Sequence, residues 1–217
     1  MRVVVFGATG MIGQGVLREC LLDAGVEHVL AVGRTPTGRT DAKLRDLVTA
    51  NLYDLSAIES ELRGFDACFF CLGVSAVGMT EEQYSRIAYD LTLSVAETLA
   101  RANPAMVFIY VSAAGASSSE TGAMWARVRG RAENALFRLP FRAFVFRPAL
   151  IRPLHGIKSR TRLYNAVYVT IAPVMPLLGH LFPGHVTTTE QIGRAMLRVA
   201  REGFPRKILH TADINSL

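Results

Sequence analysis

The feature that constrains this chain most is a glycine-spaced turn directly after its first apolar run. Residues 3–6 are apolar and mostly β-branched, and glycine follows at positions 7, 10 and 13. A strand that turns tightly into a packed helix uses glycine at such spacings, and the amides at the helix N-terminus favour a bound anion. We therefore predict a nucleotide-binding loop, made of Gly7, Thr9, Gly10, Met11, Ile12 and Gly13.

Short apolar runs alternate with helical patterns along most of the chain. Such alternation is typical of an α/β fold in which helices cover both faces of a parallel sheet. We therefore predict a doubly wound parallel sheet. The expected strands are residues 3–6, 29–32, 46–49, 67–72, 106–111, 143–147 and 206–211. The expected helices are residues 12–22, 81–101, 123–139 and 190–201.

The length and composition fit one domain. Half of the 217 residues are apolar and 19% are charged, which excludes a disordered or fibrous protein. We expect a single domain over residues 1–217, in which residues 149–185, with several prolines and basic residues, form a small cap on the substrate side. The apolar stretch at residues 166–178 is too short to span a membrane and contains two prolines, so we expect no transmembrane segment.

Positive charge is concentrated in one stretch. The net charge is +6, and residues 127–162 hold ten Lys and Arg against a single acid, Glu133. Such a stretch fits a small anionic ligand, or contact with a membrane surface, better than a nucleic-acid track, which usually needs more lysine with interleaved aromatics. We expect no nucleic-acid partner. Arg127, Arg131 and Arg138 share one helix face, and we expect that this face is exposed to solvent rather than used for binding.

The three cysteines predict buried thiols. Cys68 and Cys71 are three residues apart in an expected strand, so their side chains point to opposite faces of the sheet. They cannot form a disulfide with each other or bind one metal ion, and we expect no metal site. Free thiols are typical of a reducing compartment, and with no export signal at the N-terminus we expect a cytoplasmic protein.

The end of the second expected strand predicts the choice of cofactor. An Asp or Glu about 20 residues past the last glycine would bind the ribose hydroxyls of NAD. This chain has Gly33-Arg34 there, with Arg39 and Lys43 close behind. A guanidinium suits a 2′-phosphate, so we expect NADP(H) to be preferred over NAD(H).

These residues resemble the short-chain dehydrogenase/reductase superfamily, and most closely its atypical, epimerase-like branch, which includes Tat-interacting oxidoreductase homologues and NmrA-like proteins. The resemblance runs from residue 1 to about 203. It implies a Rossmann fold with the cofactor across the carboxyl ends of the strands, a small-molecule substrate and a homodimer. It also implies further cofactor contacts, from Asp54, Leu55, Leu72, Gly73, Pro148 and Arg129.

The chain departs from this superfamily at the residues that usually carry the chemistry. The superfamily resemblance places a Tyr four positions before a Lys on the helix after the fifth strand, where this chain has Trp125 and Arg129. An indole N–H donates but is not acidic near neutral pH, so Trp125 cannot exchange a proton with a substrate. The resemblance leaves Ser112 and Arg129 as the expected catalytic residues.

Three interpretations of this departure remain open. Another acid could serve, for example Ser112 itself or Tyr84, Tyr164, His155 or His185. The protein could instead bind NADP(H) without turnover, as a redox sensor or interaction protein of the NmrA type. Cys71 could act as a nucleophile, although a buried thiol without a paired histidine argues against it. The first interpretation favours an oxidoreductase or epimerase-like enzyme acting on an anionic or partly hydrophobic substrate.

Overall fold

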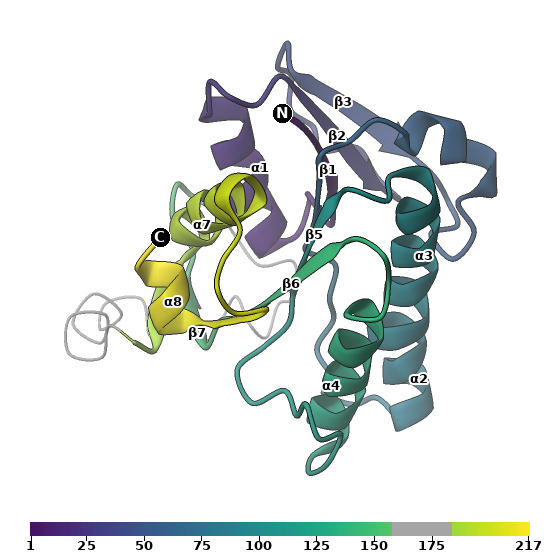
Figure 1. The fold of residues 1–217 in the computed structure, drawn as a ribbon, viewed down its shortest axis with the longest axis vertical. Helices are drawn as coiled ribbons and strands as arrows, with labels where there is room; N and C mark the ends of the chain where they lie inside the picture. The colour runs from purple at the N-terminus through teal and green to yellow at the C-terminus, as the bar shows by residue number, and fades with distance from the viewer. Residues whose placement is uncertain (158–183) are drawn as a thin grey trace.

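The fold of the computed structural model is built on a parallel sheet, and the structure describes residues 1–157 and 184–217. The seven strands lie in the order β3-β2-β1-β4-β5-β6-β9, and every neighbouring pair is parallel (Figure 1). Their bounds are β1 Arg2–Phe6, β2 His28–Gly33, β3 Leu44–Val48, β4 Ala67–Phe70, β5 Val107–Val111, β6 Arg142–Arg147 and β9 Ile208–His210. The predicted doubly wound α/β fold is confirmed.

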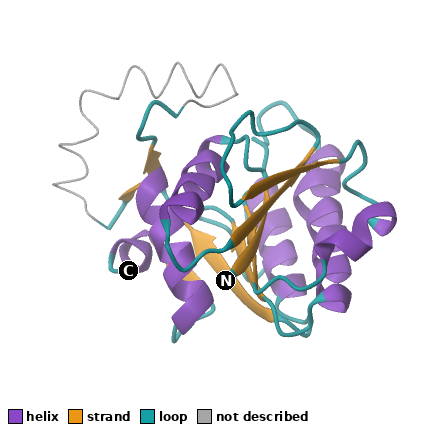
Figure 2. Ribbon diagram, turned by 90° about the horizontal axis from the view of Figure 1, so that it is seen from above, coloured by secondary structure: helices purple, strands orange, loops and turns teal. Residues whose placement is uncertain are grey.

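Helices cover both faces of this sheet (Figures 1 and 2). On one face lie α1 Met11–Leu22, α7 Thr189–Glu202 and α8 Thr211–Asn215. On the other lie α2 Glu81–Ser85, the π-helical segment η2 Arg86–Leu91, α3 Thr92–Ala102 and α4 Met124–Leu136. The alternation of strand side chains explains the two cores, because Val3 and Val5 pack toward α1 and α7 whereas Val4 and Phe6 pack toward α3.

The observed elements differ from the predicted ones at some boundaries. Strand β4 ends at Phe70, before the predicted end at residue 72, and a Cβ on Gly7 would lie 2.8 Å from the carbonyl carbon of Cys71. The chain therefore leaves the regular strand conformation after Phe70, where the glycine loop packs against it. The predicted helix at residues 81–101 begins as expected at Thr80, which forms a capping box with Gln83, but it contains the π-helical segment η2.

The predicted cap contains one strand that the sequence pattern did not indicate. This strand, β7 Leu150–Arg152, pairs in parallel with β8 Val186–Thr188, which follows the predicted cap, and the two form a separate two-stranded sheet. Thr188 then caps α7 by accepting a hydrogen bond from the Gln191 amide at 3.0 Å. Residues 158–183 of the predicted cap, with several of its basic and tyrosine residues, lie outside the described residues.

Close packing of α7 on α1 supports the helix that follows the glycine loop. A Cβ on Gly15 would lie 2.6 Å from Cβ of Thr189, and a Cβ on Gly193 would lie 2.7 Å from Cγ of Glu19. Glycine is therefore required on both helices for this approach. Within residues 1–157 and 184–217, no helix is long and apolar enough to cross a membrane, and no group of three potential metal ligands occurs.

Candidate dinucleotide site

The glycine loop presents the N-terminus of α1 to the carboxyl edge of the sheet. Gly7 has a φ of +80°, which a side chain would strain, and its carbonyl accepts a hydrogen bond from the Gly10 amide at 2.9 Å. Gly10 is the N-cap of α1 in an extended conformation, and no side chain caps the helix. The amides of the first turn, which begins with Met11 and Ile12, therefore have no side-chain acceptor and suit a pyrophosphate.

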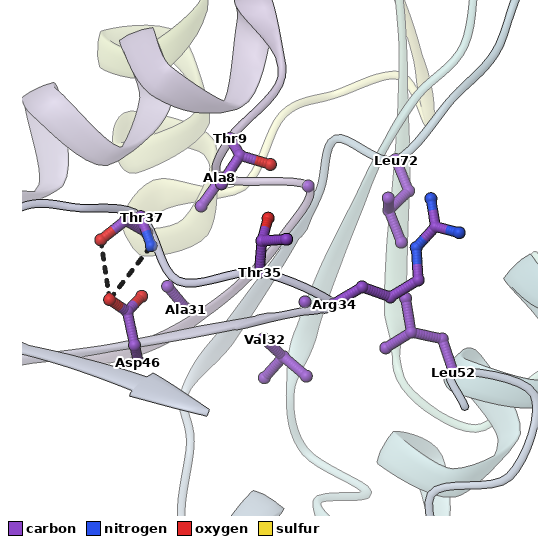
Figure 3. A pocket seen from close by; sticks show the side chains of 12 residues that line it. Ala8, Thr9, Ala31, Val32, Arg34, Thr35, Thr37, Asp46, Leu52 and Leu72 are labelled. Atoms are coloured by element: carbon purple, nitrogen blue, oxygen red, sulfur yellow. Dashed lines mark hydrogen bonds between the residues drawn. The ribbon is translucent and has the colours of Figure 1, made fainter. Parts of the chain in front are cut away.

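A cavity of about 280 Å³ lies beside this loop, at the carboxyl ends of β1 and β2 (Figure 3). Its walls come from the glycine loop, the end of β2 and the segments after β3 and β4. The lining residues are Gly7, Ala8, Thr9, Ala31, Val32, Gly33, Arg34, Thr35, Thr37, Asp46, Leu52 and Leu72. A cavity with both apolar and polar walls beside an uncapped helix N-terminus suits the adenosine half of a dinucleotide.

Arg34, the predicted cofactor-binding residue after β2, is one of the residues that line the cavity. Its side chain is exposed and extends toward Leu72 and Leu52, away from Asp46 (Figure 3). Asp46 is an acid that the sequence analysis did not single out, and it lines the cavity from β3 rather than from the end of β2. Its carboxylate accepts hydrogen bonds from Thr37, at 3.1 Å from the amide and 2.9 Å from the hydroxyl.

Two expectations about this half of the site need correction. Lys43 does not lie free beside Arg34, because its ammonium group donates to the carbonyls of Leu21 and Asp23 at the end of α1. On the adenine side the cavity is lined by Leu52, not by Asp54 and Leu55. Asp54 is exposed and accepts a hydrogen bond from the Ser56 amide at 3.0 Å, whereas Leu55 is buried in the core.

Ser112, predicted to be catalytic, is engaged in a buried ionic network. Its hydroxyl donates to the carboxylate of Glu133, which is fully buried on α4. Arg147, at the end of β6, donates from Nε to both oxygens of Glu133, at 3.1 and 3.2 Å, and from Nη2 both to Glu133 Oε2 and, at 2.7 Å, to Ser118 Oγ. The network ties the loop after β5 to α4 and to the end of β6, so it orders this edge of the sheet.

Pro148 and the loop after β5 are held together through the main chain. The Ala114 amide donates to the Pro148 carbonyl at 2.9 Å, and the Ser112 amide donates to the Phe146 carbonyl at 2.8 Å. The segment that the resemblance places beside the nicotinamide is therefore fixed to the loop that carries Ser112.

Trp125 packs against the same loop. A Cβ on Gly115, whose φ is +86°, would lie 3.0 Å from the far edge of the Trp125 indole. The indole therefore covers the glycine at the tip of the loop and joins an apolar cluster with Tyr84 and Val128. As the sequence predicts, this position offers no acidic hydroxyl group.

Arg129 reaches the carboxyl ends of β4 and β5. Its Nε donates to the Tyr84 hydroxyl at 2.8 Å and its Nη1 donates to the Val111 carbonyl at 3.4 Å. A Cβ on Gly73 would lie 3.5 Å from its Nη2. Burial lowers the pKa of the guanidinium, but the neighbouring Tyr110 and Tyr84 oxygens outweigh it and the pKa of Arg129 is raised. Arg129 therefore stays protonated at any physiological pH.

Cys71 and His155 lie in surroundings that do not favour the predicted chemistry. Burial raises the pKa of the Cys71 thiol to about 12, so this side chain is a poor nucleophile at neutral pH. His155 contacts Glu190 Oε2 at 2.6 Å at the start of α7. Tyr164 lies outside the described residues.

The parallel sheet, the uncapped helix N-terminus and the adjoining cavity define a Rossmann-type dinucleotide-binding protein. Residues 3–124 match the model of the NAD dependent epimerase/dehydratase family, and the chain belongs to this family. It is thus an NAD(P)-binding protein of the short-chain dehydrogenase/reductase type, as the sequence resemblance implied.

Two curated relatives match nearly the whole chain. Protein FMP52 of Eremothecium gossypii is 27% identical over 100% of this chain and 97% of its own length. Protein FMP52-1 of Scheffersomyces stipitis is 22% identical over 95% of this chain and 91% of its own length. Both relatives are named as mitochondrial, as are further FMP52 proteins of other fungi. The expectation of a cytoplasmic protein is therefore wrong, because buried thiols indicate reducing surroundings without naming the compartment.

Solved structures share the fold at low identity. The Bordetella bronchiseptica enzyme WbmF in complex with NAD+ superposes with a TM-score of 0.69 at 14% identity, over 99% of this chain and 76% of that one. UDP-glucose 4-epimerase of Thermotoga maritima, with UDP-glucose, gives a TM-score of 0.65 at 15% identity, over 93% and 74%.

Proposed function

We propose that this protein is an NADP(H)-dependent oxidoreductase or epimerase-like enzyme. The observation that carries the proposal is Arg34 on the wall of the adenosine-sized cavity, at the strand end where an NAD-binding protein would have an acid. The exposed guanidinium would bind the 2′-phosphate of NADP(H) through charge-assisted hydrogen bonds.

Asp46 does not argue against this preference for the phosphorylated cofactor. Its carboxylate already accepts two hydrogen bonds from Thr37, and the Arg34 side chain extends away from it (Figure 3). A 2′-phosphate near the guanidinium would therefore not have to displace the carboxylate.

The residues at the carboxyl ends of β4 and β5, beyond the cavity that Arg34 lines, suit a negatively charged substrate. A bound NADP(H) would supply or accept a hydride, and Arg129 would add a permanent positive charge beside Gly73 and the end of β5. Arginine does not lose its proton, so it can stabilise an anionic oxygen but cannot act as an acid or base. We therefore propose a small anionic substrate, such as a carboxylate-bearing carbonyl compound.

Calorimetric titration of the purified protein with NADPH and with NADH tests the cofactor assignment. The expected result is tighter binding of NADPH, and an absorbance screen of the NADPH complex against anionic aldehydes and ketones then tests for turnover. Equal affinity for the two cofactors would overturn the role of Arg34. If neither cofactor binds, the proposed function is wrong as a whole.

A second candidate function is a redox sensor that binds NADP(H) without turning it over. Two observations favour it: Trp125 covers Gly115 where a proton-exchanging phenol would lie, and the Ser112 hydroxyl donates to Glu133 rather than toward the cavity. Tight NADPH binding without oxidation of any compound in the screen would support the sensor and contradict the enzyme.

A further inference from the structure

The contact between Arg129 and Tyr84 joins two helices at the reactive end of the site. Tyr84 lies on α2 and is 1% exposed, and its hydroxyl oxygen accepts a hydrogen bond from Nε of Arg129 on α4 at 2.8 Å. An Nε–H donor is directional, so this bond restrains the direction of the Nε–H group, and the second bond, from Nη1 to the Val111 carbonyl, restrains rotation about it.

Two phenols lie beside the guanidinium, since Tyr110 at the end of β5 is also close to it. No carboxylate forms an ion pair with Arg129 among residues 1–157 and 184–217, and its bond to the Val111 carbonyl is long, at 3.4 Å. The aromatic and aliphatic residues around Tyr84, among them Val128 and Trp125, hold the phenol in place. The hydrogen bond to the Tyr84 hydroxyl is thus shorter than the one to the Val111 carbonyl.

The direction of the free guanidinium nitrogens follows from these contacts. With Nε on Tyr84 and Nη1 toward the end of β5, Nη2 lies toward Gly73, which follows β4. A Cβ at position 73 would lie in ordinary van der Waals contact with Nη2, at 3.5 Å, so the backbone of residue 73 passes directly beside this nitrogen. A ligand that crosses the ends of β4 and β5 therefore meets a donor whose orientation Tyr84 sets.

We propose that Tyr84 is the positioning residue for Arg129, so that a phenol on α2 and a guanidinium on α4 together hold the ribose-nicotinamide half of the bound dinucleotide. The inference rests on the proposed function, since it needs a dinucleotide in the site. In the superfamily that the sequence resembles, a Tyr and a Lys four residues apart on one helix lie at this end of the site. Here the two side chains would come from two helices, α2 and α4.

Binding of cofactor fragments separates this role from a general effect on the fold. Tyr84→Phe removes the hydroxyl and keeps the packing of the ring. The expected result, by calorimetry, is about tenfold weaker binding of both NADPH and NADH, which corresponds to the loss of one hydrogen bond to a charged group. Binding of adenosine 2′,5′-bisphosphate, which lacks the nicotinamide half, should stay within about twofold of the wild type.

The matched control is Tyr89→Phe. Tyr89 lies on η2, close to Tyr84 in the chain, and its ring lies 4.3 Å from the Arg131 guanidinium carbon, a contact that phenylalanine retains. This variant should bind NADPH as the wild type does. Arg129→Ala should weaken NADPH at least as much as Tyr84→Phe, and combining the two substitutions should add little, because both remove the same contact.

The outcomes distinguish the inference from the proposed function. Unchanged NADPH affinity in Tyr84→Phe would overturn the role of Tyr84 and leave the proposed function intact. An equal loss for the bisphosphate fragment would mean that Tyr84 only supports the fold, which also overturns the inference. Failure of the wild-type protein to bind both the fragment and NADPH would instead refute the proposed function.

Discussion

Gly10 and Gly13 are three residues apart in the same loop, but the structure gives them different tasks. A Cβ on Gly13 would lie 2.0 Å from the carbonyl oxygen of Gly7, so a side chain there collides with the backbone of the loop itself. At Gly10 the nearest atom would be 3.3 Å away, and the backbone is in an extended conformation that β-branched residues adopt readily. Gly13 is therefore needed for the fold, whereas the loop leaves more room for a side chain at Gly10.

The substitution Gly10→Val should abolish detectable NADPH binding while the protein remains folded. The isopropyl group would occupy the space in front of the uncapped N-terminus of α1, where a pyrophosphate would approach the amides. Calorimetry measures the affinity and thermal unfolding measures the stability. Gly13→Ala is the contrasting variant, since it should lower the unfolding temperature. Wild-type affinity in Gly10→Val would refute the loop assignment.

The substitution Arg34→Ala should weaken NADPH binding by roughly 10- to 150-fold and change NADH binding little. Hydrogen bonds to charged groups contribute about 1.5 to 3 kcal/mol, and only NADPH has the 2′-phosphate that would accept them. Arg39→Ala is a suitable control, because Arg39 is also exposed but does not line the cavity. Equal losses for the two cofactors would show that Arg34 does not contact the 2′-phosphate.

At the scale of elements, the Glu133 network links α4, the loop after β5 and the end of β6. Glu133→Gln keeps the shape of the side chain but leaves Arg147, which is 8% exposed, without its counter-charge. Breaking a buried pair in this way should lower the free energy of unfolding by about 3 to 5 kcal/mol. Urea denaturation measures this change.

A surface ion pair on the same helix provides the comparison. Arg127 pairs with Glu81 across α4 and α2, and both side chains are exposed to solvent. Arg127→Gln should therefore lower the free energy of unfolding by less than about 1 kcal/mol. If both variants lose the same stability, the buried network is no more important to the fold than a surface pair.

The sequence predicted the sheet better than it predicted the elements around it. The central strands are continuous buried runs and their order along the chain defines the doubly wound fold. Strands β7 and β8 are three residues long and pair across a long stretch of chain, so no local periodicity marks them. The place of Leu52 was missed for a similar reason, since only the path of the chain after β3 decides which of two nearby leucines reaches the cavity.

The buried network at α4 was missed although the sequence held a signal for it. Glu133 is the only acid among ten basic residues, and a lone acid in such a stretch has many possible partners. The sequence does not show which of these basic residues pairs with Glu133 in the interior. That choice depends on α4 packing behind the end of β6, where Arg147 lies. The pairing of Arg129 with Tyr84 was likewise missed, because α2 and α4 are far apart in the chain.

For the molecule as a whole, the rate at which the cysteine thiols react with a reagent measures whether the protein is folded. Cys20 and Cys68 are fully buried, and burial raises the pKa of both thiols, with that of Cys71 at about 12. Because the thiolate is the reactive form, the native protein should react very slowly with a thiol reagent at neutral pH. Reaction should become rapid over the same urea range in which the circular dichroism signal is lost. Rapid labelling of one thiol in the native protein would show that its surroundings open locally.

The packing of α7 on α1 has a consequence for the order in which the molecule is made. The face of α1 that carries Gly15 is covered by Thr189 at the start of α7, from the far end of the chain. A ribosome adds residues from the N-terminus, so the glycine loop is synthesised long before the helix that holds α1 in place. A nascent chain that already contains every residue of the cavity is therefore still without the helix that packs on α1, and cofactor binding can stabilise the protein fully only after α7 has been made.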